Sequence, residues 1–397
     1  MKSQFIANKH LFLLFLMFTT TMIFSQDWSG IAVPAELGNT NVTWELVDEL
    51  SDSFNYETSS GSIKGATFNS KWADGYVNPW PGFGNTIWTP NNSKVTGGNL
   101  ELKATSKDAA SNTNYFSAAH ARTEIIYPVY IETKVKIMNS VMANAVWMLS
   151  ANSKEEIDIV EAYGSSYSES NNTSRDWFAR RMHLSHHTFS TPSGNDYQPK
   201  DAGSYYVLPV ANGKYWRDGF HRVGVYWKDP FHLEYYIDGV LVRTVSGANI
   251  IDPDKNLGEN GMSSPETIIF SGAAQGWQVS NGVYPTVNEL SIEADNIFKI
   301  DWIRTYKRVD ANLSAIAYDV SKVVSFSSPV GNYITIKSNV DVNRVDVYQT
   351  DGRLVKSVKN ISNGKKAVFV SDLSSGIYII KVKEKSGNWY SGKMIKQ

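Results

Sequence analysis

The stretch SKEEIDIVEAYG, Ser153–Gly164, has the β-branched residues of a sheet strand interrupted by carboxylates. Ile157, Ile159 and Val160 favour an extended strand, whereas a carboxylate beside a core costs free energy unless it is paired. Because a strand alternates its side chains between two faces, this mixture predicts one apolar face and one acidic face. The acidic face is the candidate functional surface of a β-sheet.

Short segments with a similar alternation occur on both sides of this stretch, separated by turn residues. They are NLELKAT (99–105), VYIETKVKI (129–137), FHRVGVYW (220–227), HLEYYIDGVLVRTV (232–245) and FKIDWIRTYK (298–307). Asp238-Gly239 is typical of a type I′ hairpin turn, and no segment has the pattern of an amphipathic helix of three turns. We therefore expect an all-β chain whose main domain is a β-sandwich with one face of each sheet covered.

The charge of the 397-residue chain is unevenly distributed. Asp27–Asp310 carries 23 basic and 33 acidic side chains, a net charge of −10, whereas Ala311–Gln397 carries 13 basic and 6 acidic ones, a net charge of +7. This shift marks a boundary between modules. No Arg/Lys stripe indicates nucleic acid binding, and the absence of cysteine excludes disulfides and thiolate metal sites.

Residues 1–26 have the pattern of a secretory signal peptide. Lys2 and Lys9 precede the apolar run Leu11–Phe18, and small polar residues follow up to Ser25-Gln26. The strictly apolar run is shorter than the ~20 residues that a membrane span needs, which argues against the alternative of a lone anchor. We expect an exported protein with no membrane span after cleavage.

A linker at 311–328 is expected to join the large domain at 27–310 to a small β-sandwich at 329–397. Alternating Val and Ile residues are interrupted there by Asp351-Gly352, Asn363-Gly364 and Ser375-Gly376. DLSSGIYIIKV and the terminal GKMIKQ resemble the C-terminal sorting domains of the type IX secretion pathway of Bacteroidetes. The resemblance implies the type IX machinery as a partner and an extracellular or cell-surface location. An ordinary appended β-sandwich is the alternative.

Glu156, Asp158 and Glu161 are the candidate catalytic residues. Glu161 follows Glu156 by five positions and would point to the apolar face of a regular strand, but a β-bulge near Ile159-Val160 returns it to the acidic face. Neighbouring carboxylates push one another's pKa values apart, and cleavage of a glycosidic bond with retention needs one ionised carboxylate and one protonated acid. A solvated acidic strand and a Ca²⁺ site built from the three acids are the alternatives.

EEIDIVEAYG resembles the E-[I/L]-D-x-x-E signature of glycoside hydrolase family 16, which lies on a bulged strand of a jelly roll. Similarity to the β-agarases of this family extends over Trp44–Lys307, including HLSHHTF and KIDWIRTYK. The resemblance implies a concanavalin-like jelly-roll catalytic domain without a catalytic cofactor. It also implies that Glu156 is the nucleophile, Asp158 its helper and Glu161 the general acid/base.

Three tryptophans are candidate platforms for sugar rings, which stack on aromatic faces. The resemblance puts Trp147 at the −1 subsite, and the loop GYVNPWPGFGNTIWTPNN supplies Trp80 and Trp88. A tryptophan in a sandwich is more often a core residue, but the prolines beside Trp80 indicate a loop at a cleft rim.

HLSHH puts His183 and His187 on the same face of a strand. We expect both to contact sugar hydroxyls or a carboxylate, and a zinc site is the alternative. Arg180, just upstream, is a candidate contact for the substrate, including a sulfate group.

Two departures from the agarase pattern bear on the outer subsites. The agarase Trp-His-Arg reads Ile87-Trp88-Thr89-Pro90 here, and INTEDQTW reads IIFSGAAQGW at 268–277, without its acidic residue. The family resemblance also implies a structural Ca²⁺ ion held by Asp301 with the carbonyls of Ser53 and Gly98. A buried, hydrogen-bonded Asp301 is the alternative.

These observations predict a secreted, monomeric, endo-acting retaining hydrolase of the β-1,4-galactosidic bonds of agarose. A domain of net charge −10 repels a polyanion, which favours agarose over the alternative of a β-porphyranase or another sulfated-galactan hydrolase. Arg122 or Arg180 would be needed for a local sulfate pocket. A non-catalytic galactan-binding lectin is the hypothesis of another class, but binding alone does not need three clustered acids.

Overall fold

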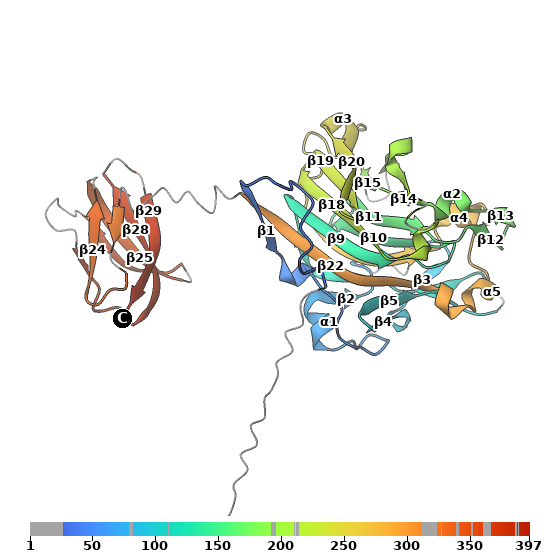
Figure 1. Cartoon of the computed structure of the whole chain (residues 1–397), viewed down its shortest axis with the longest axis horizontal. Coiled ribbons are helices and arrows are strands. Elements are labelled where there is room, and N and C mark those ends of the chain that lie inside the picture. The colour runs from blue at the N-terminus through green and yellow to red at the C-terminus, as the bar shows by residue number, and fades with distance from the viewer. Residues whose placement is uncertain are drawn as a thin grey trace, which may run out of the picture. The chain divides into compact units, whose positions relative to one another are not determined.

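The computed structural model describes residues 27–310 except 79–81, 110, 192–195, 210 and 212–213, and residues 324–397 except 327, 339–340, 351, 360–366, 386 and 388. The chain divides into two compact units, one built mainly from Trp44–Arg308 and the other mainly from Val309–Gln397 (Figure 1). The predicted signal peptide and most of the predicted linker lie outside the described residues. In the described part, no helix has the length and hydrophobicity needed to cross a membrane.

Two large sheets form the first unit, one with eight and one with nine strands among the described residues. The eight-stranded sheet has the order β20-β19-β18-β9-β22-β5-β4 with β1 paired to β22, and the nine-stranded sheet has the order β16-β15-β11-β10-β21-β8-β2 with β14 on β11 and β17 on β14. The eight strands are β1 (Val42–Leu46), β4 (Ser93–Thr96), β5 (Asn99–Lys103), β9 (Val129–Lys136), β18 (His221–Asp229), β19 (His232–Ile237), β20 (Val240–Ser246) and β22 (Ile297–Asp310). The nine strands are β2 (Trp72–Asp74), β8 (Ala119–Ile125), β10 (Ala143–Ser150), β11 (Glu155–Tyr163), β14 (Arg181–His183), β15 (Ser185–Phe189), β16 (Asp196–Tyr197), β17 (Tyr205–Val207) and β21 (Glu266–Ala273).

The remaining elements of this unit are short and lie between the large sheets' strands in sequence. The small strands are β3 (Thr86–Trp88), β6 (Thr105–Ser106), β7 (Asn114–Phe116), β12 (Tyr167–Ser168) and β13 (Thr173–Ser174). The α-helices are α1 (Ala66–Lys71), α2 (Asp176–Ala179), α3 (Ala248–Ile251), α4 (Gly276–Ser280) and α5 (Val287–Leu290), and the 3₁₀ helices are Asp48–Leu50, Pro90–Asn92, Ala202–Ser204, Trp216–Asp218 and Glu293–Asp295. The helices are thus all shorter than three turns, and the predicted all-β jelly-roll sandwich is confirmed.

The predicted hairpin joins β19 to β20. Asp238 and Gly239 have φ angles of 49° and 84°, the positive values that a type I′ turn requires at both central positions. The aliphatic face of each sheet packs into one core, in which Ile131 and Val225 of one sheet join Val146 and Ile157 of the other. Burial of each such side chain stabilises the fold by about 1.5–3 kcal/mol.

The opposite face of the eight-stranded sheet is also covered at its centre, which the alternating sequence did not predict. Glu132 of β9 and Arg304 of β22 are fully buried there and form a salt bridge, with Arg304 Nε 2.7 Å from Glu132 Oε2. Arg304 also donates to the carbonyls of Ile31 and Ala32, at 2.6 and 3.2 Å. The chain segment before β1 therefore covers the pair and supplies the acceptors that a buried cation needs.

The second unit has its own small core, as expected of a separate β-sandwich. Val345, Val347, Ile380 and Val382 are buried in it, together with Met394. Its strands are β23 (Val324–Phe326), β24 (Tyr333–Ser338), β25 (Val342–Gln349), β26 (Leu354–Lys359), β27 (Ala367–Phe369), β28 (Gly376–Glu384) and β29 (Trp389–Lys396). They form a three-stranded sheet β23-β24-β27 and a four-stranded sheet β26-β25-β28-β29 among the described residues.

Replacing Arg304 with Met should lower the free energy of unfolding by about 3 kcal/mol, because buried Glu132 then keeps only the more distant Arg222, at 3.5 Å, as its counter-charge. Urea denaturation followed by tryptophan fluorescence measures this change. The double variant Glu132→Gln/Arg304→Met removes both charges and should recover part of the loss. A single variant that is as stable as the parent would contradict the role of this ion pair.

Candidate active site

A cleft of about 1190 Å³ lies over the nine-stranded sheet, on the side away from the core. The central strand β11 contributes the three predicted acids to it. Trp147 of β10 and Ser271 of β21 line the cleft on one side of β11, and His183 of β14 and His187 of β15 line it on the other.

A β-bulge in β11 brings the acids together. Val160 pairs with Val146 and Asp158 pairs with Trp147, which leaves Ile159 as the extra residue. This is the predicted bulge, and it has the predicted consequence, because Ile159 and Val160 are both fully buried in the core. Glu156, Asp158 and Glu161 all line the cleft.

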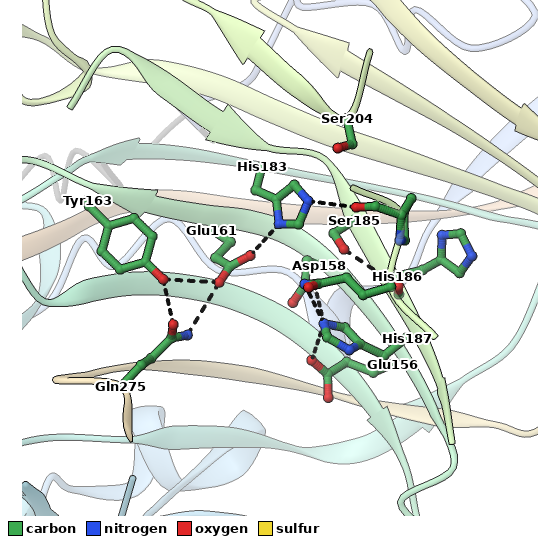
Figure 2. Close-up of polar contacts among 12 residues, drawn as sticks. Glu156, Asp158, Glu161, Tyr163, His183, Ser185, His186, His187, Ser204 and Gln275 are labelled. Atoms are coloured by element: carbon green, nitrogen blue, oxygen red, sulfur yellow. Dashed lines mark hydrogen bonds and ion pairs between the residues drawn. The ribbon is translucent and has the colours of Figure 1, made fainter. Parts of the chain in front are cut away.

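One histidine lies against two of the three acids (Figure 2). His187 Nε2 is 3.7 Å from Glu156 Oε1 and 3.6 Å from Asp158 Oδ2. Its other ring nitrogen, Nδ1, is 2.7 Å from Asp196 Oδ1, and the Gln198 amide lies 2.7 Å from Nε2. The segment that carries Asp196 and Gln198 therefore contacts both ring nitrogens, and Nε2 also faces the two carboxylates.

The pKa values of this cluster are strongly shifted. Burial raises the pKa of Glu156 to about 8, with the cationic His187 opposing the shift and the Asp158 charge adding to it. Burial likewise raises the pKa of Asp158 to about 6. Burial lowers the pKa of His187, but Glu156 and the hydrogen bond to Asp196 outweigh it and raise the value to about 10. Near neutral pH, Glu156 and Asp158 together hold one proton beside an imidazolium, and the two groups titrate as a unit.

The third acid is paired with a second histidine (Figure 2). His183 Nδ1 is 2.8 Å from Glu161 Oε2, and His183 Nε2 is 3.0 Å from the Pro199 carbonyl. Tyr163 Oη and Gln275 Nε2 each lie 3.3 Å from Glu161 Oε1. Burial favours the neutral carboxyl, but the His183 hydrogen bond and charge lower the pKa of Glu161 below its usual range.

The proton of this pair is confined to one hydrogen bond. The Pro199 carbonyl can only accept, so His183 Nε2 must carry a hydrogen. One further proton lies between Nδ1 and Glu161 Oε2. Although burial lowers the pKa of His183, the Glu161 hydrogen bond raises it above its usual value, so the proton resides on the ring in the free protein.

Aromatic rings form the wall of the cleft beside β10. Tyr76 stacks on Trp147, with ring centroids 5.8 Å apart, and packs against Trp88 at 5.1 Å with the two rings tilted by 32°. Trp147 Nε1 donates to Ser271 Oγ at 2.9 Å and Trp88 Nε1 donates to the Gly272 carbonyl at 3.0 Å. These bonds orient both indole rings, and each lines the cleft.

Two other residues predicted to bind the substrate, Trp80 and Arg180, are not found among the described cleft residues. Trp80 lies outside the described residues. Arg180 is not among the cleft residues and has Asp176 3.9 Å away. Its neighbour Arg181 lines the cleft instead, because Arg181 and His183 share one face of β14 while Met182 between them is buried.

Asp301 was predicted to hold Ca²⁺ together with the carbonyls of Ser53 and Gly98, or else to be a paired acid. Its Oδ2 lies 2.5 Å from Lys134 Nζ, which is the paired arrangement. In the part of the chain that the structure describes, Glu156, Asp158 and His187 are the group of His and acidic residues close enough to share a metal ion. A metal ion there would have to displace the proton that the raised pKa of His187 keeps on the ring.

Several cleft residues could not be found from the sequence pattern. Gln198 and Asp196 come from the segment after β15, and Tyr76, Trp177 and Trp277 come from loops or short helices. Loop side chains have no periodicity that would indicate their direction. Only the local richness in Trp and Tyr was available as a signal.

Each of the two units matches a different family of known proteins. Residues 44–308 match the family described as "Beta-porphyranase A-D, GH16 domain", and residues 326–397 match "Secretion system C-terminal sorting domain". The chain is 45% identical over 302 residues to Beta-agarase B of Zobellia galactanivorans, covering 72% of this chain and 83% of that protein. It is 44% identical over 300 residues to Beta-agarase AgaA of Microbulbifer thermotolerans, covering 76% and 67%. A crystal structure of an inactivated mutant of beta-agarase B in complex with agaro-octaose has a TM-score of 0.67 and 43% identity, covering 72% of this chain and all (100%) of that one.

Replacing Asp158 with Asn should lower the pKa of Glu156 from about 8, because the negative charge that disfavours its ionisation is removed. The value should stay above that of an exposed glutamate, since burial is unchanged. Carbon NMR of labelled glutamate carboxyls across a pH titration measures the shift. An unchanged pKa for Glu156 would show that the two carboxyls do not titrate together.

Proposed function

Since the chain belongs to glycoside hydrolase family 16, in the group of β-porphyranases and β-agarases, and ends in a secretion-system sorting domain, we propose that it is an exported endo-hydrolase that cuts the β-1,4-galactosidic bonds of agarose with retention. The single observation that carries the proposal is the bulged strand with its three acids under an aromatic wall. The sorting domain makes the protein secreted or cell-surface attached.

Glu156 is the proposed nucleophile and Glu161 the proposed general acid. Glu156 attacks the anomeric carbon as a carboxylate, and Glu161 protonates the leaving glycosidic oxygen, which gives a covalent glycosyl-enzyme intermediate. Water then attacks the anomeric carbon while Glu161 takes its proton as general base, and the bond between that carbon and Glu156 breaks. The chemistry of this family needs no catalytic cofactor.

Asp158 accepts the proton that Glu156 must lose before it can attack. The two carboxyls hold one proton between them near neutral pH, with apparent pKa values of about 6 and about 8. When the proton is on Asp158, Glu156 is free to attack. When the ester has formed, Glu156 carries no charge and the proton stays on Asp158, from which it can return to Glu156 after hydrolysis. In the free protein His187 stabilises the single negative charge on whichever carboxyl carries it.

His183 holds the proton that Glu161 needs. In the free protein this proton lies on the ring, 2.8 Å from Glu161 Oε2. Transfer across this hydrogen bond turns Glu161 into the acid form at the moment the leaving oxygen requires it. The raised pKa of His183 and the lowered pKa of Glu161 in the free state are compatible with an acid role, because the pair as a whole is protonated.

Agarose is the proposed substrate because it is neutral. The acids of the cleft do not repel it, and Tyr76, Trp88 and Trp147 offer flat apolar faces to its sugar rings. A β-porphyranase activity is the alternative within the family. A galactan-binding lectin does not need a nucleophile and an acid. The separate histidines that set the protonation states of these carboxyls therefore favour an enzyme.

We further propose the domain limits of a signal peptide at 1–26, a catalytic domain at 27–310, a linker at 311–328 and a sorting domain at 329–397. We also propose a monomer, because the described cleft is complete within one chain. No step of the mechanism involves calcium.

Replacing Glu156 with Gln should reduce hydrolysis of agarose by roughly a thousandfold or more, since no other group can form the covalent intermediate. Glu155→Gln is the matched control, because Glu155 lies one residue away and bonds Ser264 instead of lining the cleft. Reducing-sugar release measures both variants. Full activity of the Glu156 variant in a folded protein would refute the proposed nucleophile.

Digestion of agarose should yield even-numbered neutral oligosaccharides, whereas porphyran and carrageenans should be cut more slowly, because the acidic cleft disfavours polyanions. Mass spectrometry of the products, side by side, measures this preference. Release of sulfated oligosaccharides alone would favour the porphyranase alternative. Agarose that is bound but never shortened would favour the lectin.

A further inference from the structure

Two basic side chains line the otherwise acidic cleft and are not used by the proposed mechanism. The described cleft residues include the acids of β11 and Asp196, but among lysines and arginines only Arg181 and Lys200. Both come from the part of the chain around β14 and the segment before β17. Neutral agarose gives no reason for cations in this place.

Their location relative to the reacting bond follows from the sheet order. β14 and β10 lie on opposite sides of β11, so Arg181 lies across β11 from Trp147. Arg181 is two residues from His183 on the same face, a separation of about 7 Å along a strand. His183 in turn contacts Glu161. Arg181 therefore lies about one sugar unit beyond the proposed general acid, on the side away from the Trp147 wall.

Arg181 is held in a defined position. Its Nη1 donates to the Trp177 carbonyl at 3.0 Å, and its guanidinium lies 4.5 Å from the centroid of the Trp177 ring. Trp177 itself is about half exposed, at 45%, while its ring also contacts Phe178 and Tyr205. An arginine stacked on a half-exposed aromatic ring can recognise a sugar that carries an anionic group.

The chemistry points to a sulfate ester. A planar guanidinium binds tetrahedral oxyanions through paired charge-assisted hydrogen bonds. Lys200 adds a second positive charge on this side of β11, because it follows Pro199, whose carbonyl lies 3.0 Å from His183 Nε2. The overall acidity of the domain disfavours a polyanion at a distance, but one sulfate paired with Arg181 and Lys200 is compensated locally.

We propose that Arg181, Lys200 and Trp177 form a subsite for a sulfate ester on the galactan unit that departs with the leaving group. This rests on the proposed function, since it takes Glu161 as the acid that faces the leaving group. The enzyme then cuts neutral bonds in agarose and also those bonds of partly sulfated agar that carry sulfate only on the departing side.

Partly sulfated agar digested to completion gives the test, because each cut creates one new reducing end and one new non-reducing end. Sequencing of the products by tandem mass spectrometry should find sulfate close to new non-reducing ends and not at new reducing ends. Arg181→Met should lower the yield of these sulfated products by about tenfold relative to the yield of neutral products from agarose. Lys200→Met should act in the same direction with a smaller effect.

Arg180→Met is the matched control, because Arg180 is the adjacent arginine outside the cleft, and it should change neither yield. Sulfate found only next to new reducing ends, or an Arg181 variant that loses agarose and sulfated agar equally, would overturn the subsite. A parent enzyme that does not cut agarose at all would instead overturn the proposed function, so the two failures are distinguishable.

Discussion

The repulsion among three carboxylates on one strand is the constraint that the rest of the cleft satisfies. Glu156, Asp158 and Glu161 are brought to one face by a single extra residue in β11, and at that spacing they cannot all ionise freely. Two histidines resolve the conflict in two ways. His187 is shared between Glu156 and Asp158, whereas His183 forms a direct hydrogen bond to Glu161. The acids thus divide into two separately protonated groups.

The segment that precedes β17 is as important as the catalytic strand, because it holds both rings. Asp196 bonds the Nδ1 of His187, and the Pro199 carbonyl bonds the Nε2 of His183. Asp201 anchors this segment, because its two carboxylate oxygens are each 2.9 Å from the Arg243 guanidinium. A paired, planar contact of this kind has a defined geometry. The protonation state of the acids therefore depends on a loop far from them in sequence.

The charges inside the cleft differ from the net charge of the domain that contains it. Asp27–Asp310 has a net charge of −10, yet the cleft is lined by a cationic imidazole and by the basic side chains of Arg181 and Lys200. Inside a partly buried cleft these neighbours act at short range with little screening, whereas the net charge acts through solvent and is screened. Substrate preference therefore depends on which side chain of the cleft a charged group of the sugar chain contacts.

The sequence alone determined the all-β architecture, the division into two units and the acidic strand with its bulge. These features depend on the alternation of side chains and on the spacing of Glu156, Asp158 and Glu161, which are local properties of an extended chain. Only the tertiary structure decided that His183 and His187 serve the acids, that Arg181 and not Arg180 enters the cleft, and that Arg304 is buried under the segment before β1. Each of these depends on contacts between residues distant in sequence, whose geometry comes from loops and from the pairing order of strands. Alternation along a single strand carries no information about either.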